Sequence, residues 1–419
     1  MKRSAFAVWL VFLIFFVISL VTNILGSIIP NIIGDFGLSL FVASLVAFSF
    51  FIAYGVMSIP AGVLLERYRE KPVLVASFVL AFVGSMAFAA APRFAVMLPS
   101  LFLIGAAFAM LQVAINPLLR VAGGEEHFAF NSAAAQLIFG LASFLSPWLY
   151  AYLVQGLQAG EPTSPLIGLL SRVVPASLPW VSLYWVFAFL TLVMIGVLLA
   201  VRLPKVVLKE DERAGAVATY KALLRKPIVL LYFLGIFMYV GTEQGVANWI
   251  SQFLSTYHGF DPLEEGKSAV SLFWGLMTAG CVLGLVLLKL FDSRRVLVGF
   301  SAAAMLTLTV ALFGPAEVSR WAFPLIGFCA SVMWPIIFSL ALNSVDRHHG
   351  AFSGILVTGI VGGALLPPVV GALGDVLGLR YGMMALYLSL GYILAIGIWA
   401  RPLINNATIR DASTGGGSA

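Results

Sequence analysis

Charged residues are scarce in this sequence, since only 10% of its 419 residues are Asp, Glu, Lys or Arg. Soluble domains carry about 25%. Hydrophobic residues make up 61% of the chain, and its mean hydropathy is +1.04. These values exclude a soluble or disordered protein. Cysteine is scarce too: Cys281 and Cys329 each fall within an apolar run, so we expect no disulfide framework.

The sequence also lacks the signatures of several functional classes. No loop of the form Gly-x-x-x-x-Gly-Lys-Ser/Thr is present, which argues against ATP as an energy source. No nucleophile constellation is found, and the four histidines show no ligand spacing on a shared face. We therefore expect neither an enzyme nor a metal or cofactor site. The net charge of +6 comes from basic loops and indicates no nucleic-acid partner.

Long apolar runs, by contrast, are abundant. Twelve runs with few or no charges are each long enough to cross about 30 Å of hydrocarbon as a helix. They lie near residues 6–29, 40–65, 72–91, 94–119, 128–153, 180–201, 228–256, 268–290, 296–313, 321–344, 351–376 and 381–400. We predict an all-α membrane protein with twelve transmembrane helices. Its first span is expected to be retained, because no small-residue cleavage site follows it.

Basic residues gather on one side of these spans. Of the 24 Lys and Arg residues, those on the opposite side are Arg93, Arg172, Lys267, Arg320 and Arg380. Short basic loops are rarely translocated. We therefore expect a multi-pass protein of the inner (plasma) membrane with both termini in the cytoplasm.

The charged segment 202–226 divides the spans into two sets of six. We expect residues 1–201 and 227–404 to form two six-helix bundles joined by a cytoplasmic linker at 202–226. Residues 405–419 end in a low-complexity stretch, and we expect a disordered tail or a tag scar there.

The two sets of spans repeat each other. Residues 103–130 align without a gap on residues 325–352, at an offset of 222, and Leu-Ile-Gly, the final His and Ala-Phe coincide. Near the same offset, Gly62 falls on Gly284. A repeat with an even number of helices enters the membrane twice in the same orientation, which predicts a two-fold axis along the membrane normal. Two such six-helix repeats are typical of the major facilitator superfamily.

Four segments resemble the fucose permease family and its sodium-dependent glucose transporter relatives. They are MLQVAINPLLR from Met110, HFAFNSAAAQLIFG from His127, MYVGTEQGVANW from Met238 and VGGALLPPVVGALGD from Val361. The resemblance implies the major facilitator fold and cation-coupled sugar transport. In the fucose permeases, carboxylates in the first and fourth spans carry proton coupling. The matching positions here are Gly26 and Gln112, which have no titratable side chain.

One acidic residue, Glu243, lies near the middle of a span. An ionised carboxylate there costs about 2.5 to 3.5 kcal/mol, so it is expected to face a cavity, to pair or to be protonated. It can exchange a proton as access alternates, or bind Na+ together with backbone carbonyls loosened by Gly241 and Gly245. The structural alternative is a hydrogen bond that joins two helices.

Amide side chains accompany this carboxylate. Gln112 and Asn116 lie four residues apart, hence on one helical face, and Gln244 and Asn248 repeat the spacing. Amides donate and accept hydrogen bonds without net charge, as the binding of sugar hydroxyls requires. For each amide the alternative is a hydrogen bond between helices. The further substrate-site candidates are Asn23, Gln136, Trp274 and Trp334, the tryptophans as flat faces for sugar C–H groups.

No Lys, Arg or His occupies the middle of a span, so an anionic substrate would find no countercharge. We predict a secondary transporter that imports a neutral hexose-like sugar by H+ or Na+ symport through alternating access, as a monomer in the lipid bilayer. The alternative is an exporter of amphiphilic drugs or lipids by proton antiport, in which Glu243 attracts a cationic amphiphile. The amides favour the sugar.

Charges in two loops are candidates for a gate. ERYREK after the second span and DSRR after the eighth occupy equivalent corners of the two repeats. We predict that Glu66 or Asp292 pairs with Arg120 or Arg347 when the site faces outward, because alternating access needs contacts that exist in one state only. The alternative is a solvated loop whose charges only set the topology.

Overall fold

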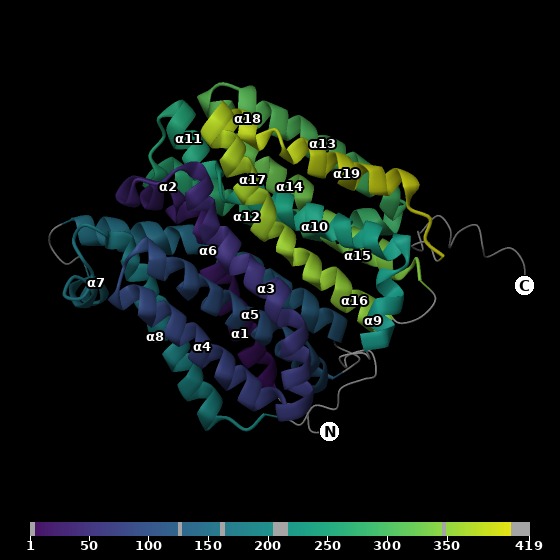
Figure 1. Cartoon of the computed structure of the whole chain (residues 1–419), viewed down its shortest axis with the longest axis horizontal. Helices are drawn as coiled ribbons and strands as arrows, with labels where there is room; N and C mark the ends of the chain where they lie inside the picture. Colours follow the sequence, from purple (N-terminus) through teal and green to yellow (C-terminus); the bar gives the residue numbers. More distant parts are fainter. Residues whose placement is uncertain (1–4, 125–127, 160–163, 204–216, 346–348, 404–419) are drawn as a thin grey trace, which may run out of the picture.

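The structure is a computed structural model that describes residues 5–124, 128–159, 164–203, 217–345 and 349–403. Twelve helical segments in this part of the chain are long and apolar enough to cross a membrane. The prediction of an all-α protein with twelve membrane-spanning helices is therefore confirmed. Figure 1 shows these helices packed lengthwise against one another.

The first six spans end at Ala200. They are formed by α1 (Ala5–Thr22) with α2 (Leu25–Phe36), α3 (Leu40–Tyr68), α4 (Glu70–Ala90), α5 (Phe94–Gly123), α6 (Phe128–Gln158) and α8 (Ser182–Ala200). The connection before α8 contains α7 (Pro165–Leu170) and the 3-10 turn η2 (Pro179–Val181). A short helix, α9 (Val217–Leu224), lies in the segment expected to be the linker.

The last six spans begin at Pro227. They are formed by α10 (Pro227–Ala247) with α11 (Ile250–His258), the π-turn η4 (Pro262–Gly266) with α12 (Lys267–Leu290), α13 (Ser293–Phe313), α14 (Ala316–Ala330) with α15 (Met333–Leu342), α16 (His349–Thr358) with η5 (Gly359–Val361) and α17 (Gly362–Leu377), and α18 (Leu379–Met383) with α19 (Leu386–Trp399).

Both sets of spans pack in the same pattern. In the first set, α1 packs on α6, α3 on α5 and α4 on α8, and the corresponding pairs of the second set are α10 with α17, α12 with α14 and α13 with α19. Figure 1 shows the two sets as separate bundles, one purple to teal and the other teal to yellow. The bundles meet where α3 lies against α17 and α6 against α12. The two six-helix repeats are thus present in three dimensions.

The bundle has two distinct ends. Figure 1 places α9 at one end, called here the linker end, whereas α2, α7, α11 and α18 lie at the opposite, far end. At the linker end each repeat uses one cation to cap its last helix. The Lys71 ammonium donates to the carbonyl oxygens of Leu199 and Val201, at 3.0 and 2.7 Å, and the Arg294 guanidinium donates to Ala400, at 3.3 Å. Cations at helix C-termini satisfy carbonyls that have no intrahelical donor.

Several spans that the sequence predicts as continuous helices are interrupted, among them the first and the seventh. The first breaks after Thr22 and the seventh after Ala247, close to Asn23 and Asn248 respectively. The two breaks touch, because a Cβ atom at Gly26 would overlap the carbonyl oxygen of Ala247. Glycine is therefore required where the first span crosses the seventh. These breaks bring non-helical backbone into the region between the bundles, which is where transporters place their binding groups.

Candidate functional site

Two neighbours on α10 hold the carboxylate of Glu243 in place. The Tyr239 hydroxyl donates to Oε2 at 2.6 Å, and the Gln244 amide nitrogen donates to Oε1 at 3.1 Å. Tyr239 is fixed in turn by Trp334, whose ring centroid lies 5.9 Å away and which stacks on Phe338. A donor on each oxygen favours the ionised form of the carboxylate, because hydrogen bonds to a charged acceptor are stronger than those to a neutral one. The oxygens that this group offers to a cation belong to Glu243, Tyr239 and Gln244.

The hydrogen-bond chain continues to the break in the seventh span. The Asn248 amide nitrogen donates to the backbone oxygen of Gln244 at 2.8 Å and to its side-chain oxygen at 3.4 Å. Oδ1 of Asn248 is buried and has no hydrogen-bond partner among the described residues. Gln244 also lies at the junction of the bundles, because a Cβ at Gly363 would meet both Gln244 and Phe51 within 3.2 Å. Gln244 and Asn248 therefore join Glu243 in one polar group.

One face of α12 lines the same region. Trp274 and Cys281 lie two turns apart on this face, whereas Leu283 and Val286 on the opposite side are 40% and 53% exposed, as residues that face lipid are. Trp274 is buried, and its indole nitrogen has no partner among the described residues. Cys281 is exposed, and its thiol lies 3.4 Å from the carbonyl oxygen of Ser331.

The candidates from the first repeat differ in their surroundings. Gln112 is half-buried, Asn116 is exposed and donates to the backbone oxygen of Gln112 at 3.2 Å, and Gln136 is exposed. Asn23, in contrast, is buried and donates to Ser143 at 2.7 Å and to Ser19 at 3.3 Å. The Asn23 amide nitrogen thus joins α1 to α6. A hydrogen bond between helices is the structural alternative that the sequence analysis gave for each amide.

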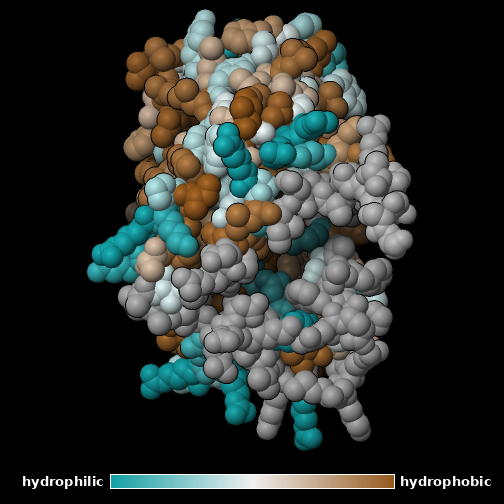
Figure 2. Space-filling model, turned by 90° about the vertical axis from the view of Figure 1, so that its right-hand side faces the viewer, coloured by the Kyte–Doolittle hydropathy of each residue, from teal (hydrophilic) through white to brown (hydrophobic). Residues whose placement is uncertain are grey.

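Exposure of these side chains changes along the bundle. The exposed Asn116, Gln136 and Cys281 lie nearer the linker end, whereas the buried Gln244 and Trp274 lie nearer the far end. The view of the linker side shows a recess between the bundles with hydrophilic residues in its depth (Figure 2). The side chains exposed in this structure are thus those nearer the linker end, and the polar group around Glu243 lies deeper and is mostly buried.

The candidate gating charges make different contacts. Asp292 caps α13 by accepting from the backbone nitrogen of Arg294 at 2.8 Å, and its carboxylate pairs with the Arg294 side chain at 2.8 Å. The hydrogen bond from the Arg294 side chain is the main reason that the pKa of Asp292 lies below its ordinary value of 3.8, and burial opposes this shift. Glu66 is exposed at the end of α3 and Arg120 is buried near the end of α5. Arg347 lies outside the described residues. The gate stays a prediction for the outward-facing state.

Comparison with known proteins agrees with this architecture. The family model described as the Major Facilitator Superfamily matches residues 11–361. The chain belongs to this superfamily. This major facilitator protein is 29% identical to the glucose/galactose transporter of Brucella abortus over 413 residues. The alignment covers 95% of this chain and 94% of that protein. It is 24% identical to the L-fucose-proton symporter of Escherichia coli, covering 87% and 86% of the two chains.

Solved structures share the major facilitator fold. The Escherichia coli fucose:proton symporter superposes with a TM-score of 0.66 at 20% identity, over 96% of this chain and 100% of that one. A bacterial homologue of the human lysosomal transporter Spinster superposes with a TM-score of 0.80 at 14% identity, over 94% and 96% of the two chains. At these identities the likeness establishes the fold alone.

Two residues of the site escaped the sequence analysis. Tyr239 precedes Glu243 by four residues, so helical spacing places both on one face and would have identified it. Cys281 was read only as an unpaired cysteine, and its position on the inner face of α12 becomes evident once the lipid-facing side of that helix is known.

Proposed function

We propose that this major facilitator protein is a secondary transporter that imports a neutral hexose-like sugar, driven by H+ or Na+ bound at Glu243. The observation that carries the proposal is the hydrogen-bond chain from Asn248 through Gln244 to Glu243, closed by Tyr239. It combines one titratable carboxylate with neutral donors and acceptors at the junction of the two bundles. Buried polar groups of this kind are characteristic of substrate and ion pathways.

Sugar recognition is assigned to the amides beside the recess. Gln112 is half-buried and Asn116 and Gln136 are exposed, and their amides offer both donors and acceptors to hydroxyl groups. Trp334 supplies a half-buried aromatic face next to Tyr239. The named relatives, a glucose/galactose transporter and a fucose-proton symporter, support a hexose. These amides also argue against an exporter of amphiphilic drugs or lipids, whose cavity would be apolar.

Coupling is assigned to the change of charge at Glu243. The Tyr239 hydroxyl can donate to the ionised carboxylate and, after rotation, accept from the protonated form, so both states can be held. A Na+ ion would instead require oxygen ligands at the carboxylate, with Gln244 turned to present its carbonyl. A bound cation drives uptake only if it favours one access state over the other. Glu243 is held by residues of its own helix, and one of them, Gln244, lies at the junction of the bundles, so movement of the bundles can change the surroundings of the carboxylate.

Purified protein in liposomes tests this function. Exchange of labelled glucose, galactose and fucose is measured without gradients, followed by net uptake with pH and Na+ gradients imposed separately. We expect exchange of at least one hexose and accumulation driven by one of the two gradients. A protein that exchanges none of these sugars, while amphiphilic cations move against a proton gradient, would contradict the proposal.

A further inference from the structure

At the far end, a carboxylate of the second bundle caps a helix of the first. Asp375, near the end of α17, accepts from the backbone nitrogens of Leu40 and Phe41, at 2.7 and 2.9 Å. Both are first-turn donors of α3, which have no partner within their own helix. A carboxylate at this place is stabilised by charge-assisted hydrogen bonds and by the helix dipole. The contact therefore ties α17 to α3 across the junction of the bundles.

Glycine allows the two helices to come this close. A Cβ at Gly371 would lie 2.8 Å from the carbonyl oxygen of Leu40, and one at Gly374 would lie 2.8 Å from the Leu40 side chain. Both distances are shorter than real Cβ contacts. The end of α17 thus rests directly on the start of α3, and any larger side chain at Gly371 would move Asp375 away from its two donors.

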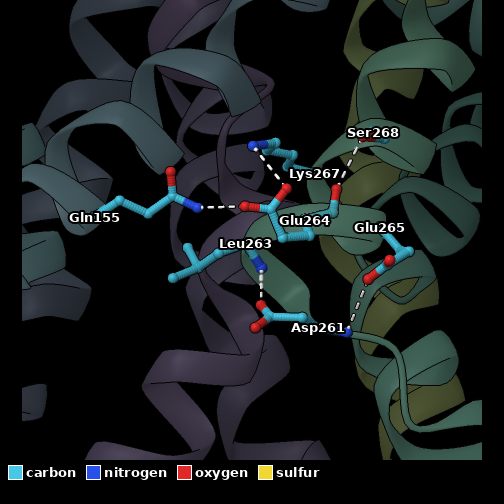
Figure 3. Close-up of polar contacts among 7 residues, drawn as sticks. All are labelled: Gln155, Asp261, Leu263, Glu264, Glu265, Lys267 and Ser268. Atoms are coloured by element: carbon cyan, nitrogen blue, oxygen red, sulfur yellow. Dashed lines mark hydrogen bonds and ion pairs between the residues drawn. The ribbon is translucent and has the colours of Figure 1, made fainter.

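A second polar contact joins the other pair of helices that meet at this end. Gln155, near the end of α6, donates to Oε1 of Glu264 in η4 at 2.7 Å (Figure 3). Lys267 lies 3.5 Å from Oε2 of the same carboxylate, and its ammonium stands 4.9 Å above the ring of Trp148 in α6. Lys267 is only 7% exposed. Glu264 and Lys267 of the second bundle therefore both reach α6 of the first.

The two contacts occupy equivalent places in the repeats. The fifth span of one repeat meets the second span of the other: α6 meets α12, and α17 meets α3. In each case the end of one helix contacts the beginning of its partner, and both contacts lie at the end opposite the accessible recess. A single rotation of one bundle against the other would break both together.

We infer that two contacts form a far-end latch: the contact of Asp375 with the start of α3, and the contact of Glu264 with Gln155. The latch holds the site closed at the far end and opens when the site turns to that side. The inference rests on the proposed alternating access. The latch stabilises the state seen here relative to the opposite one. Its loss shifts the population toward far-side access, and for two hydrogen bonds at a solvent-exposed carboxylate we expect a shift of about three- to tenfold.

The native thiol Cys281 reports which side has access. The chain is prepared with Cys329→Ala and reconstituted in sealed vesicles of each orientation. A membrane-impermeant maleimide is then applied from the linker side or from the far side. The parent chain is expected to react mainly from the linker side. Asp375→Asn and Gln155→Ala should each raise the far-side labelling rate about three- to tenfold, and the double variant should raise it further.

Glu317→Gln is the matched control, because this carboxylate lies at the same end and pairs within α14, with Arg320 at 3.7 Å. Its far-side rate should equal that of the parent. The latch is refuted if Asp375→Asn, Gln155→Ala and the double variant all label from the far side no faster than Glu317→Gln. Gln155 is exposed, so Gln155→Ala keeps the test valid even if Asp375→Asn folds poorly. Labelling needs neither sugar nor ion, and its outcome is therefore separate from that of the transport proposal.

Discussion

The hydroxyl of Tyr239 donates a 2.6 Å hydrogen bond to the carboxylate of Glu243, one helical turn further along α10. The Tyr239 ring packs against Trp334, which fixes the hydroxyl without help from the carboxylate. The donor is therefore in place whatever the charge of Glu243. Such a preorganised partner stabilises the ionised form and, by rotating its proton, tolerates the neutral one.

Removing this hydroxyl should weaken coupling selectively. Tyr239→Phe keeps the ring and its contact with Trp334 but leaves Oε2 of Glu243 without its donor. A hydrogen bond to a charged group contributes about 1.5 to 3 kcal/mol, so gradient-driven sugar accumulation should fall about tenfold or more. Sugar exchange without a gradient should persist. Tyr392→Phe is the control, because that hydroxyl donates to the backbone of Leu231 instead. Equal accumulation by the two variants would show that Tyr239 has no part in coupling.

The amide of Gln112 provides a test of sugar recognition. If it binds a sugar hydroxyl, Gln112→Ala should weaken sugar binding by about 1 to 3 kcal/mol, because a buried hydroxyl loses its partner. Isothermal titration of the purified protein measures this. Gln252→Ala is a suitable control, since Gln252 bonds to Thr256 in α11, at the far end. Unchanged affinity in a folded Gln112→Ala protein would remove this residue from the site.

Replacing either of two glycines of α2 by alanine should change the stability of the protein, in opposite directions at the two positions. Gly26→Ala places a methyl group against the backbone of Ala247, and overpacking of this kind costs about 1 to 3 kcal/mol. Gly34→Ala has nothing within 4 Å and removes a flexible residue from a helix, which should stabilise by about 0.4 to 1 kcal/mol. Melting temperatures in detergent compare the two variants. A stable Gly26→Ala protein would mean that the first and seventh spans do not cross this closely.

Asp292 should contribute stability that depends on pH. Its pKa in the folded protein lies below 3.8, chiefly because Arg294 donates to it. The stabilisation is therefore fully present well above pH 3.8 and is lost as the pH falls through the lower, folded-state value. Asp292→Ala also loses the cap of α13, at a cost of about 0.5 to 2 kcal/mol at neutral pH.

Asp292→Asn separates the charge from the cap, because asparagine is an equally good N-cap. We expect the parent to melt above Asp292→Asn at pH 7 and the difference to shrink as the pH falls below 3.8 toward the lower pKa of the folded protein. A difference that grows on acidification would have the wrong sign for a depressed pKa and would exclude the pairing with Arg294.

The sequence predicted the spans because lipid imposes a simple rule on composition. A helix of about 20 apolar residues satisfies its own backbone, so the apolar runs alone locate it. The repeat was visible because residues 103–130 and 325–352 align without a gap. The capping of α8 by Lys71 was not predictable, since its carbonyl partners lie 128 and 130 residues away.

The candidate site was predictable where its contacts are local. Glu243 and Gln244 lie on α10 and Asn248 directly follows it, and their hydrogen bonds span at most four residues. Asn23 shows the opposite case, because its partner Ser143 lies 120 residues further along and gives no signal in the sequence. The helix breaks were missed for a related reason. Asparagine is compatible with a continuous helix, and only the close crossing at Gly26 shows where the two interruptions meet.

The central claim is that cation coupling passes through Glu243, and Glu243→Gln tests it most directly. This substitution preserves size and hydrogen-bonding capacity while fixing the charge at zero. Purified parent and variant are compared in liposomes at saturating labelled sugar, first by exchange without gradients and then by uptake under the pH or Na+ gradient that drives the parent. We predict that exchange survives and accumulation is lost, because a cation that no longer binds cannot favour one access state. A Glu243→Gln protein that accumulates sugar at the native rate would contradict the account.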